Sequence, residues 1–274
     1  MISGNVGRNF EGRRPYNRML PGLLKLGPLA LSFYGLAVAL GVMAGLLLLG
    51  LTAPRRGLPA AAVRDFCFWM VLAGLLGSRL AYVAFHWPEF ERDLGGILAY
   101  WRGGLMFQGG LAGALLASPF FLKKEGLPFW PAFDVLVPSL ALGQALGRLG
   151  CLSAGCCYGR PLEPGDDWGL TFPFGSQAPA GLPLWPTQVV ESFFLALLAL
   201  GLTVALRAAW ARRPGRVAAL YLAGAGSLRL VMEFFRGDFR GEPLFYGLPP
   251  TTLAAALTLV LGLALLFRAR KPAG

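Results

Sequence analysis

Seven stretches of the chain are almost entirely apolar, and each is about as long as a lipid bilayer is thick. A helix needs about 17–25 apolar residues to cross the hydrocarbon core. Charged, glycine-rich or proline-rich segments separate these stretches, which predicts an all-α integral membrane protein with about seven transmembrane helices. We place the helices at 29–51, 62–86, 104–122, 131–150, 187–207, 216–235 and 249–268.

The composition supports the same class. The 274 residues are 55% hydrophobic and 14% charged, whereas a soluble domain carries about 25% charged residues. The 38 glycines suit close helix packing in a membrane. We therefore divide the chain into a basic N-terminal tail (1–28), one polytopic membrane domain (29–268) and a short cytoplasmic C-terminal tail (269–274).

Lys and Arg are unevenly distributed between alternating loops. One set of loops holds twelve cations and two acids, and the other set holds six cations and eight acids. Cations accumulate on the cytoplasmic side of a membrane. The first set of loops and the C-terminus are therefore expected in the cytoplasm, and seven spans then place the N-terminus outside.

The N-terminal tail and the overall net charge need separate explanations, and neither changes the expected orientation. The N-terminal tail is also basic, so it is either translocated despite its charge or lies on the membrane surface. The net charge of +11 comes mainly from residues beside the spans. Anionic membrane lipid explains such charge, so we expect no nucleic-acid partner.

Arg148 lies near the end of the fourth span and opens the segment GRLGCLSAGCCYGRP (147–161). A charge at membrane depth costs about 2.5–3.5 kcal/mol on insertion scales, so such residues usually face a cavity. Five residues of the segment are Gly or Pro, which predicts a broken, non-helical outer segment. Its freed backbone N–H groups, with Arg148 and Arg160, would suit a phosphate. The alternative is an arginine that extends to the lipid headgroups.

Arg229 and Glu233 are four residues apart and share one face of the sixth span. The simplest interpretation is an ion pair that hides two charges within the helix packing. Arg236 follows on nearly the same side, which favours a polar stripe over a single closed pair.

Gln108 begins the third span in the glycine-rich segment WRGGLMFQGGLAG (101–113). Gly109 and Gly110 allow a ligand or a backbone to approach closely, but this segment by itself is better explained by glycine-rich helix crossing. Tyr34, near the outer end of the first span, is a residue type common at membrane interfaces.

Three further embedded charges are interpreted as structural. Glu191 and Arg79 are candidates for a mutual ion pair. Asp134 lies near the start of the fourth span and is expected to interact with that helix terminus.

Three of the four cysteines crowd the predicted outer segment. An oxidising compartment would permit a disulfide, and Cys151 with either Cys156 or Cys157 is the preferred pairing, because a bridge between neighbours is strained. The C-x4-C-C spacing is not a usual zinc pattern, so we expect no metal.

Seven segments carry a resemblance to a known family. Their order and spacing resemble prolipoprotein diacylglyceryl transferases over most of the chain. The segments are FYGLAVALG (33–41), GSRLAYVAFHWPEF (77–90), GGLMFQGGLAGALLA (103–117), GRLGCLSAGCCYGRP (147–161), WGLTFP (168–173), PTQVVES (186–192) and SLRLVMEFFRGD (227–238).

The resemblance implies a reaction and a location. Such enzymes transfer the diacylglyceryl group of phosphatidylglycerol to the lipobox cysteine thiol of a prolipoprotein in the bacterial cytoplasmic (inner) membrane, without a cofactor. It implies catalytic roles for Arg229, Glu233, Gln108 and Tyr34. It implies substrate binding by a second set of residues: Arg148, Gly109, Gly110, Gly159 and Arg236.

This chain departs from the family pattern around its outer polar residues. The family usually has His where Gln108 stands, and that His is a proposed general base. Cys151 and Ala154 replace two Asn residues, Cys156 replaces an acidic residue, and Trp185 replaces a His. Two other hypotheses therefore remain beside the transferase. One is an inactive or redirected paralogue that binds phosphatidylglycerol or prolipoprotein without transfer, and the other is a thiol-based redox or metal-handling membrane protein.

Overall fold

The computed structural model describes residues 24–26, 29–91, 93–100, 103–163, 165–166, 168–240 and 247–268. Most of the predicted basic tail and the whole C-terminal tail lie outside these residues. Within them, seven helices have 18 or more residues: α1 Phe33–Thr52, α2 Ala60–Phe85, α4 Phe107–Lys124, α5 Phe129–Ala154, α6 Thr187–Ala205, α7 Arg216–Glu233 and α8 Pro250–Arg268.

The shorter elements lie between the long helices or before the first of them. An antiparallel hairpin precedes α1, where the sequence predicted the first helix to begin at residue 29. The short elements are β1 Leu24–Leu26, β2 Leu29–Leu31, η1 Ala53–Arg56, α3 Trp87–Phe90, η2 Leu94–Leu98 and η4 Ala209–Arg212.

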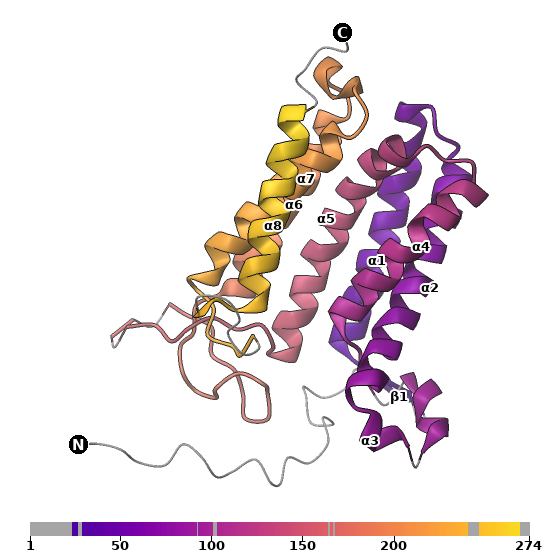
Figure 1. The fold of residues 1–274 in the computed structure, drawn as a ribbon. Coiled ribbons are helices and arrows are strands. Elements are labelled where there is room, and N and C mark those ends of the chain that lie inside the picture. Colours follow the sequence, from indigo (N-terminus) through magenta and orange to yellow (C-terminus); the bar gives the residue numbers. More distant parts are fainter. Residues whose placement is uncertain are drawn as a thin grey trace.

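The long helices run side by side, with α5 between one group formed by α1, α2 and α4 and another formed by α6, α7 and α8 (Figure 1). The main packed pairs are α1 with α5, α2 with α4, α5 with α6 and α7 with α8. Glycines permit several of these contacts. A Cβ on Gly77 of α2 would lie 3.0 Å from the Cα of Gly113 of α4, and one on Gly226 of α7 would lie 2.7 Å from the backbone N of Leu259 of α8.

The prediction of an all-α membrane protein is confirmed. Five helices within the described ranges are long and apolar enough to cross a membrane, namely α1, α2, α5, α6 and α8. Long apolar side chains such as Leu47, Leu116 and Phe193 are exposed on the helix surfaces, as expected where lipid surrounds a protein. The count of seven spans stays a prediction, since α4 and α7 are not among the five.

The segment from 155 to 186 lies at one end of the bundle, which we call the loop end (Figure 1). Its described residues form isolated β-bridges and no strand, and the bridges include Pro161 with Leu184 and Phe172 with Ala180. Phe172, Ala178 and Leu184 form its small buried core. This segment is the irregular region predicted after the fourth span.

Candidate functional site

Glu191, in the second turn of α6, is the centre of a buried ion-pair network at the loop end. Its side chain is almost fully buried and pairs with arginines from three parts of the chain. The Nε of Arg148 on α5 contacts Glu191 Oε2. The Nη1 of Arg229 on α7 lies 3.5 Å from Glu191 Oε1, and the Nη1 of Arg236 lies 3.7 Å from the same oxygen.

Glu233 extends the network from α7 toward α8. Its Oε2 lies 3.2 Å from Arg229 Nη2, which is the pairing predicted from their spacing. Its Oε1 contacts Arg240 Nη1 and accepts a hydrogen bond of 2.8 Å from Thr252 Oγ1. The polar stripe predicted on the sixth span is therefore present, and it has partners on other elements.

Arg236 joins the network to the irregular segment. Its Nε and Nη2 donate to the two carboxylate oxygens of Asp238 at 2.7 and 2.6 Å. Its backbone forms an antiparallel bridge with Gly159. A Cβ on Gly159 would lie 2.5 Å from Trp185 Cβ, so this glycine allows three segments to meet. We call the whole assembly the arginine network: Arg148, Arg229, Arg236 and Arg240 with Glu191, Glu233 and Asp238.

The arginine network has an excess of positive charge. Four guanidinium groups face three carboxylates, which leaves one net positive charge. Arg229 Nη1 and Arg236 Nη1 are buried and face Glu191 Oε1 at 3.5 and 3.7 Å, but none of these three atoms has a hydrogen-bond partner among the residues described. Because unmade hydrogen bonds of buried groups are costly and the arginines outnumber the carboxylates, the network can accommodate an anionic ligand.

Arg148 lies within α5, which contradicts the prediction that the helix breaks at this segment. The helix continues through Gly147 and Gly150 and ends only at Ala154. Gly155 then adopts a left-handed conformation with φ +66° and caps the helix. Helical hydrogen bonding occupies the backbone beside Arg148, so its guanidinium is the group available to a phosphate.

Tyr34 lies in the first turn of α1 and packs toward α5. A Cβ on Gly150 would lie 3.2 Å from Tyr34 Cδ2, so this glycine lets the tyrosine ring approach the turn that follows Arg148. The side chain is 46% exposed. The fold thus places Tyr34 against the last two turns of α5, close in the chain to Arg148.

Gln108, Gly109 and Gly110 occupy the first turn of α4. A Cβ on Gly109 would lie 2.5 Å from the carbonyl oxygen of Gly77 on α2, and one on Gly110 would lie 3.1 Å from that of Gly74. Gly109 and Gly110 therefore allow α4 to pack closely against α2. The Gln108 side chain is exposed. Within the described ranges, no hydrogen bond or ion pair joins it to the arginine network.

Arg79 and Glu191 do not pair with each other, contrary to expectation. Arg79 is buried and donates hydrogen bonds to backbone carbonyls of the α3–η2 region, including those of Gly96 at 2.6 Å and Ile97 at 2.9 Å. Its role is structural, as predicted, but its partners are backbone groups. The carboxylate of Glu191 pairs with Arg148, Arg229 and Arg236, and not with Arg79.

Asp134 also has a partner that the sequence did not indicate. Its two carboxylate oxygens accept hydrogen bonds of 2.8 Å from the backbone N–H groups of Gly215 and Ala218. It therefore caps the start of α7, not the start of its own helix, and Arg56 lies 3.9 Å away. Asp134 does interact with a helix terminus, as expected, but the helix is α7 and not its own.

Three thiols lie beside the arginine network. All four cysteines are free, and no disulfide joins the described cysteines. The sulfur atoms of Cys151, Cys156 and Cys157 lie within 4.8 Å of one another. Hydrogen bonds with the other two thiols lower the pKa of Cys157, and the positive charges of Arg236 and Arg148 lower it further.

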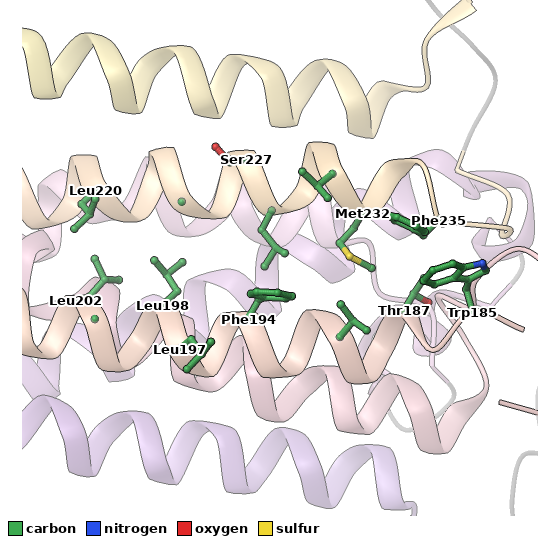
Figure 2. Close-up of a pocket in the computed structure, with 15 residues that line it drawn as sticks. Trp185, Thr187, Phe194, Leu197, Leu198, Leu202, Leu220, Ser227, Met232 and Phe235 are labelled. Atoms are coloured by element: carbon green, nitrogen blue, oxygen red, sulfur yellow. The ribbon is translucent and has the colours of Figure 1, made fainter. Parts of the chain in front are cut away.

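An apolar groove of about 740 Å³ lies between α6 and α7, along one side of their contact. Side chains such as Phe194, Leu202 and Leu220 line its length (Figure 2). Trp185 and Phe235, whose ring centroids are 4.5 Å apart, lie at its loop end. Arg236 of the arginine network follows Phe235 directly in the chain, so the loop end of the groove lies near the network.

Comparison with known proteins identifies the family. The family model described as prolipoprotein diacylglyceryl transferase matches residues 21–268. The chain belongs to this family. Three curated relatives are named phosphatidylglycerol–prolipoprotein diacylglyceryl transferase. The protein of Synechococcus elongatus is 34% identical over 225 residues, covering 80% of this chain and 77% of the relative.

The other two relatives cover slightly more of the chain. The protein of Clostridium tetani is 34% identical over 230 residues, covering 82% of this chain and 88% of the relative. The protein of an Azoarcus species is 34% identical over 252 residues, covering 90% of this chain and 93% of the relative. The match to the family model, at residues 21–268, includes every residue of the arginine network.

The sequence did not predict that Glu191 is the centre of the arginine network. It also did not predict that Arg240 and Thr252 contact Glu233. A signal for Glu191 was present, because a carboxylate inside an apolar helix must be paired. The sequence offered several arginines as partners and gave no means to choose among them. Arg240 lies after the end of α7, and Thr252 lies in the first turn of α8. Only the folded chain brings these two segments to Glu233.

Proposed function

We propose that this protein transfers the diacylglyceryl group of phosphatidylglycerol to the lipobox cysteine thiol of prolipoproteins. The substrate thiol loses its proton to water, and the sulfur attacks the glycerol carbon that bears the phosphate ester. A carbon–sulfur bond forms, the carbon–oxygen bond breaks, and glycerol phosphate leaves with the electron pair. Family membership and the arginine network together support this reaction.

The net positive charge of the arginine network is the observation that carries the proposal. The leaving group gains negative charge as its carbon–oxygen bond breaks, and fixed guanidinium groups in a site of low polarity stabilise such charge strongly. Arg148 and Arg229 are held by Glu191 before substrate arrives. The network therefore needs little rearrangement to bind a phosphodiester.

The apolar groove suits the rest of the substrates. It runs along α6 and α7, is lined mainly by hydrocarbon side chains and ends at Trp185 and Phe235, the residue before Arg236. We assign it to an apolar substrate segment, either an acyl chain of the lipid or the signal-peptide helix of the prolipoprotein. Both would enter from the surrounding bilayer, with the reacting end at the arginine network.

Thiol activation is the step for which this chain lacks the usual residue. Gln108 cannot accept a proton. A free thiol has a pKa near 8.5, so a few per cent is thiolate at neutral pH. General-base assistance contributes about 10²–10⁴-fold, so the reaction survives without a dedicated base but is slowed unless another group activates the sulfur.

Charge distribution supports a location in the bacterial inner membrane. The basic loops at 53–56, 123–125 and 207–216 lie at the end of the bundle opposite the loop end (Figure 1). By the positive-inside rule that end faces the cytoplasm. The start of α1 and the arginine network would then face the outer side, where prolipoproteins present their lipobox.

Reconstitution tests the proposed reaction. The purified protein in phosphatidylglycerol vesicles is incubated with a lipobox peptide, and mass spectrometry measures diacylglyceryl addition to the cysteine. We expect transfer by the wild type, at least a hundredfold less by Arg148→Ala, and wild-type transfer by Arg64→Ala, which removes an exposed arginine far from the network. Equal activity of the two variants would contradict the assignment.

A binding paralogue is the second candidate, favoured by the absence of a proton acceptor at Gln108. It would bind phosphatidylglycerol through the same arginines without forming a thioether. Saturable phosphatidylglycerol binding that Arg148→Ala abolishes, with no peptide modification by a correctly folded wild type, would establish the paralogue and exclude the transferase.

A further inference from the structure

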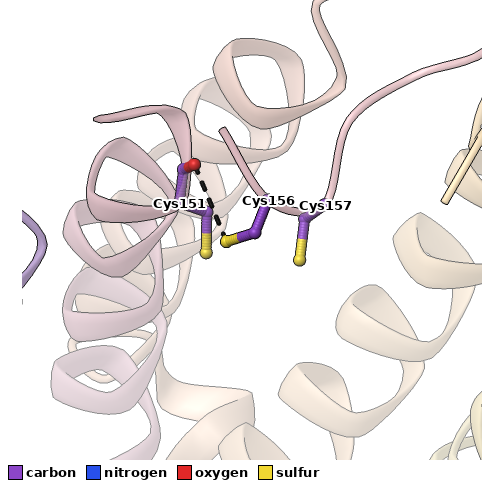
Figure 3. A group of neighbouring side chains, drawn as sticks. All are labelled: Cys151, Cys156 and Cys157. Carbon is purple, nitrogen blue, oxygen red and sulfur yellow. Dashed lines mark hydrogen bonds between the residues drawn. The ribbon is translucent and has the colours of Figure 1, made fainter. Parts of the chain in front are cut away.

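Three cysteines that are unevenly spaced in the sequence converge at the loop end. Cys151 lies in the last turn of α5, and Cys156 and Cys157 follow the helix directly. Their sulfur atoms lie within 4.8 Å of one another. The sulfur of Cys156 points toward that of Cys151, and the sulfurs of Cys151 and Cys157 point in the same direction (Figure 3).

The backbone at the end of α5 creates this convergence. Gly155 reverses the chain, and the backbone N of Cys156 donates to the carbonyl of Cys151 at 3.1 Å. Cys157 has φ +60° and is the only residue other than glycine with positive φ in the described part of the chain. That conformation costs about 1 kcal/mol or more for a residue with a Cβ. Such strain persists where the surroundings impose it, commonly at functional sites.

The first residues of α6 hold the two neighbouring cysteines in place. Thr187 Oγ1 donates to the carbonyl of Cys157 at 3.0 Å, and Gln188 Nε2 donates to the carbonyl of Cys156 at 2.9 Å. Both donors are buried. The backbone that carries two of the three thiols is therefore fixed before any ligand binds, as metal sites require.

The geometry fits a thiophilic metal ion with one open position. Zinc–sulfur bonds of about 2.3 Å in a tetrahedron place the sulfur atoms roughly 3.8 Å apart, so small rotations of the side chains suffice here. Zinc with three protein ligands keeps a fourth position for a substrate, which is the arrangement of catalytic zinc sites. The complex with three thiolates has one negative charge, which suits a site beside Arg148 and Arg236.

We propose that Cys151, Cys156 and Cys157 bind a zinc ion whose fourth coordination position takes the lipobox cysteine thiol. This inference rests on the proposed transferase function. On coordination the substrate thiol releases its proton to water, because a metal-bound thiol is deprotonated. The bound thiolate then attacks the glycerol carbon, and the phosphate oxygen takes the electron pair of the broken bond. No oxidant or reductant is needed.

The zinc site would supply the activation that Gln108 cannot. The product is an uncharged thioether, a weaker zinc ligand than a thiolate, so it leaves the metal readily. The leaving phosphate is stabilised separately, by the arginine network next to the thiols. The metal would thus act on the attacking sulfur and the arginines on the leaving phosphate oxygen, the two groups that form and break bonds to the same glycerol carbon.

Cobalt substitution in the full-length, reduced protein tests the metal site without any activity measurement. We expect one Co²⁺ per chain with sulfur-to-cobalt charge-transfer absorption, and one zinc per chain by elemental analysis of protein purified without chelators. Cys157→Ala should lose the charge-transfer band. Cys67→Ala, which removes the buried cysteine of α2, should keep it.

A lipobox peptide then tests the fourth position. Adding the peptide to the cobalt protein should shift the spectrum, and the same peptide with serine in place of its cysteine should not. A wild type without the charge-transfer band, equal loss in Cys67→Ala, or a disulfide within the three-cysteine cluster of the native protein would overturn the metal site. A cobalt band that the cysteine peptide leaves unchanged would overturn the role in thiol activation.

The two proposals fail separately. Transfer activity in protein that binds no metal would leave the transferase standing and remove the zinc site. A cobalt spectrum that responds to the cysteine peptide in protein without transfer activity would support the zinc site and contradict the transferase.

Discussion

Glu191→Gln removes the central negative charge of the arginine network and keeps the shape of the side chain. Glu191 is 2% exposed and pairs with three arginines. Without the carboxylate, Arg148, Arg229 and Arg236 would repel one another in a buried site. We therefore expect this one substitution to lower both stability and transfer.

The magnitude follows from the burial of the pairs. Breaking a buried ion pair by removing one partner costs about 3–5 kcal/mol. The side chains of Arg148 and Arg229 remain 24% and 22% exposed, so water screens part of the repulsion. We expect a loss near the lower limit, about 3 kcal/mol, which lowers the folding equilibrium constant by about a hundredfold.

Reversible unfolding in mixed detergent micelles measures this loss, and the transfer assay follows activity in parallel. Glu163→Gln is the matched control, since it makes the same chemical change at an exposed position of the irregular segment and should alter stability by no more than about 0.5 kcal/mol. Displaced guanidinium groups should also lower kcat by about a hundredfold. A stability loss in Glu191→Gln no larger than that in Glu163→Gln would refute the reasoning.

Three further substitutions test other parts of the structure. Gly109→Ala should destabilise the protein through the tight α2–α4 crossing, whereas Gly147→Ala, where a Cβ meets open space, should not; equal effects on thermal unfolding would contradict the crossing. Asp134→Asn should cost about 1–2 kcal/mol, because the substitution replaces one of the two accepting oxygens with an NH2 group that would face a backbone N–H at the start of α7; unchanged unfolding would contradict this cap. Gln108→Ala should lower kcat by less than about tenfold, because Gln108 is no proton acceptor; a loss of 10²-fold or more would give it a role comparable to a general base.

Local patterns predicted the helices well. The expected spans and the observed helices differ by only a few residues at each end, because long apolar runs determine them. The least accurate prediction was the break at Gly147. Glycine lowers helix stability by about 1 kcal/mol at most, and packing of Gly150 against Tyr34 in α1 outweighs that cost. The chain leaves the helix only where Gly155 takes the left-handed conformation.

The candidate site was predicted in part. Spacing on one helix was enough to pair Arg229 with Glu233. It could not reveal Glu191 as the common partner of arginines on three separate segments, because that depends on how α5, α6 and α7 pack. The sequence did place three cysteines in one segment, but it favoured a disulfide of Cys151 with Cys156 or Cys157. The structure has three free thiols there instead, brought together by the left-handed Gly155 and Cys157.

The rate of a single turnover at saturating phosphatidylglycerol tests the central claim most directly, namely that the arginine network stabilises the leaving phosphate. Arg229→Gln should slow thioether formation by about 10²–10³-fold while the protein stays folded, because a donor to the developing charge is lost. An unchanged single-turnover rate in a folded Arg229→Gln protein would contradict the account.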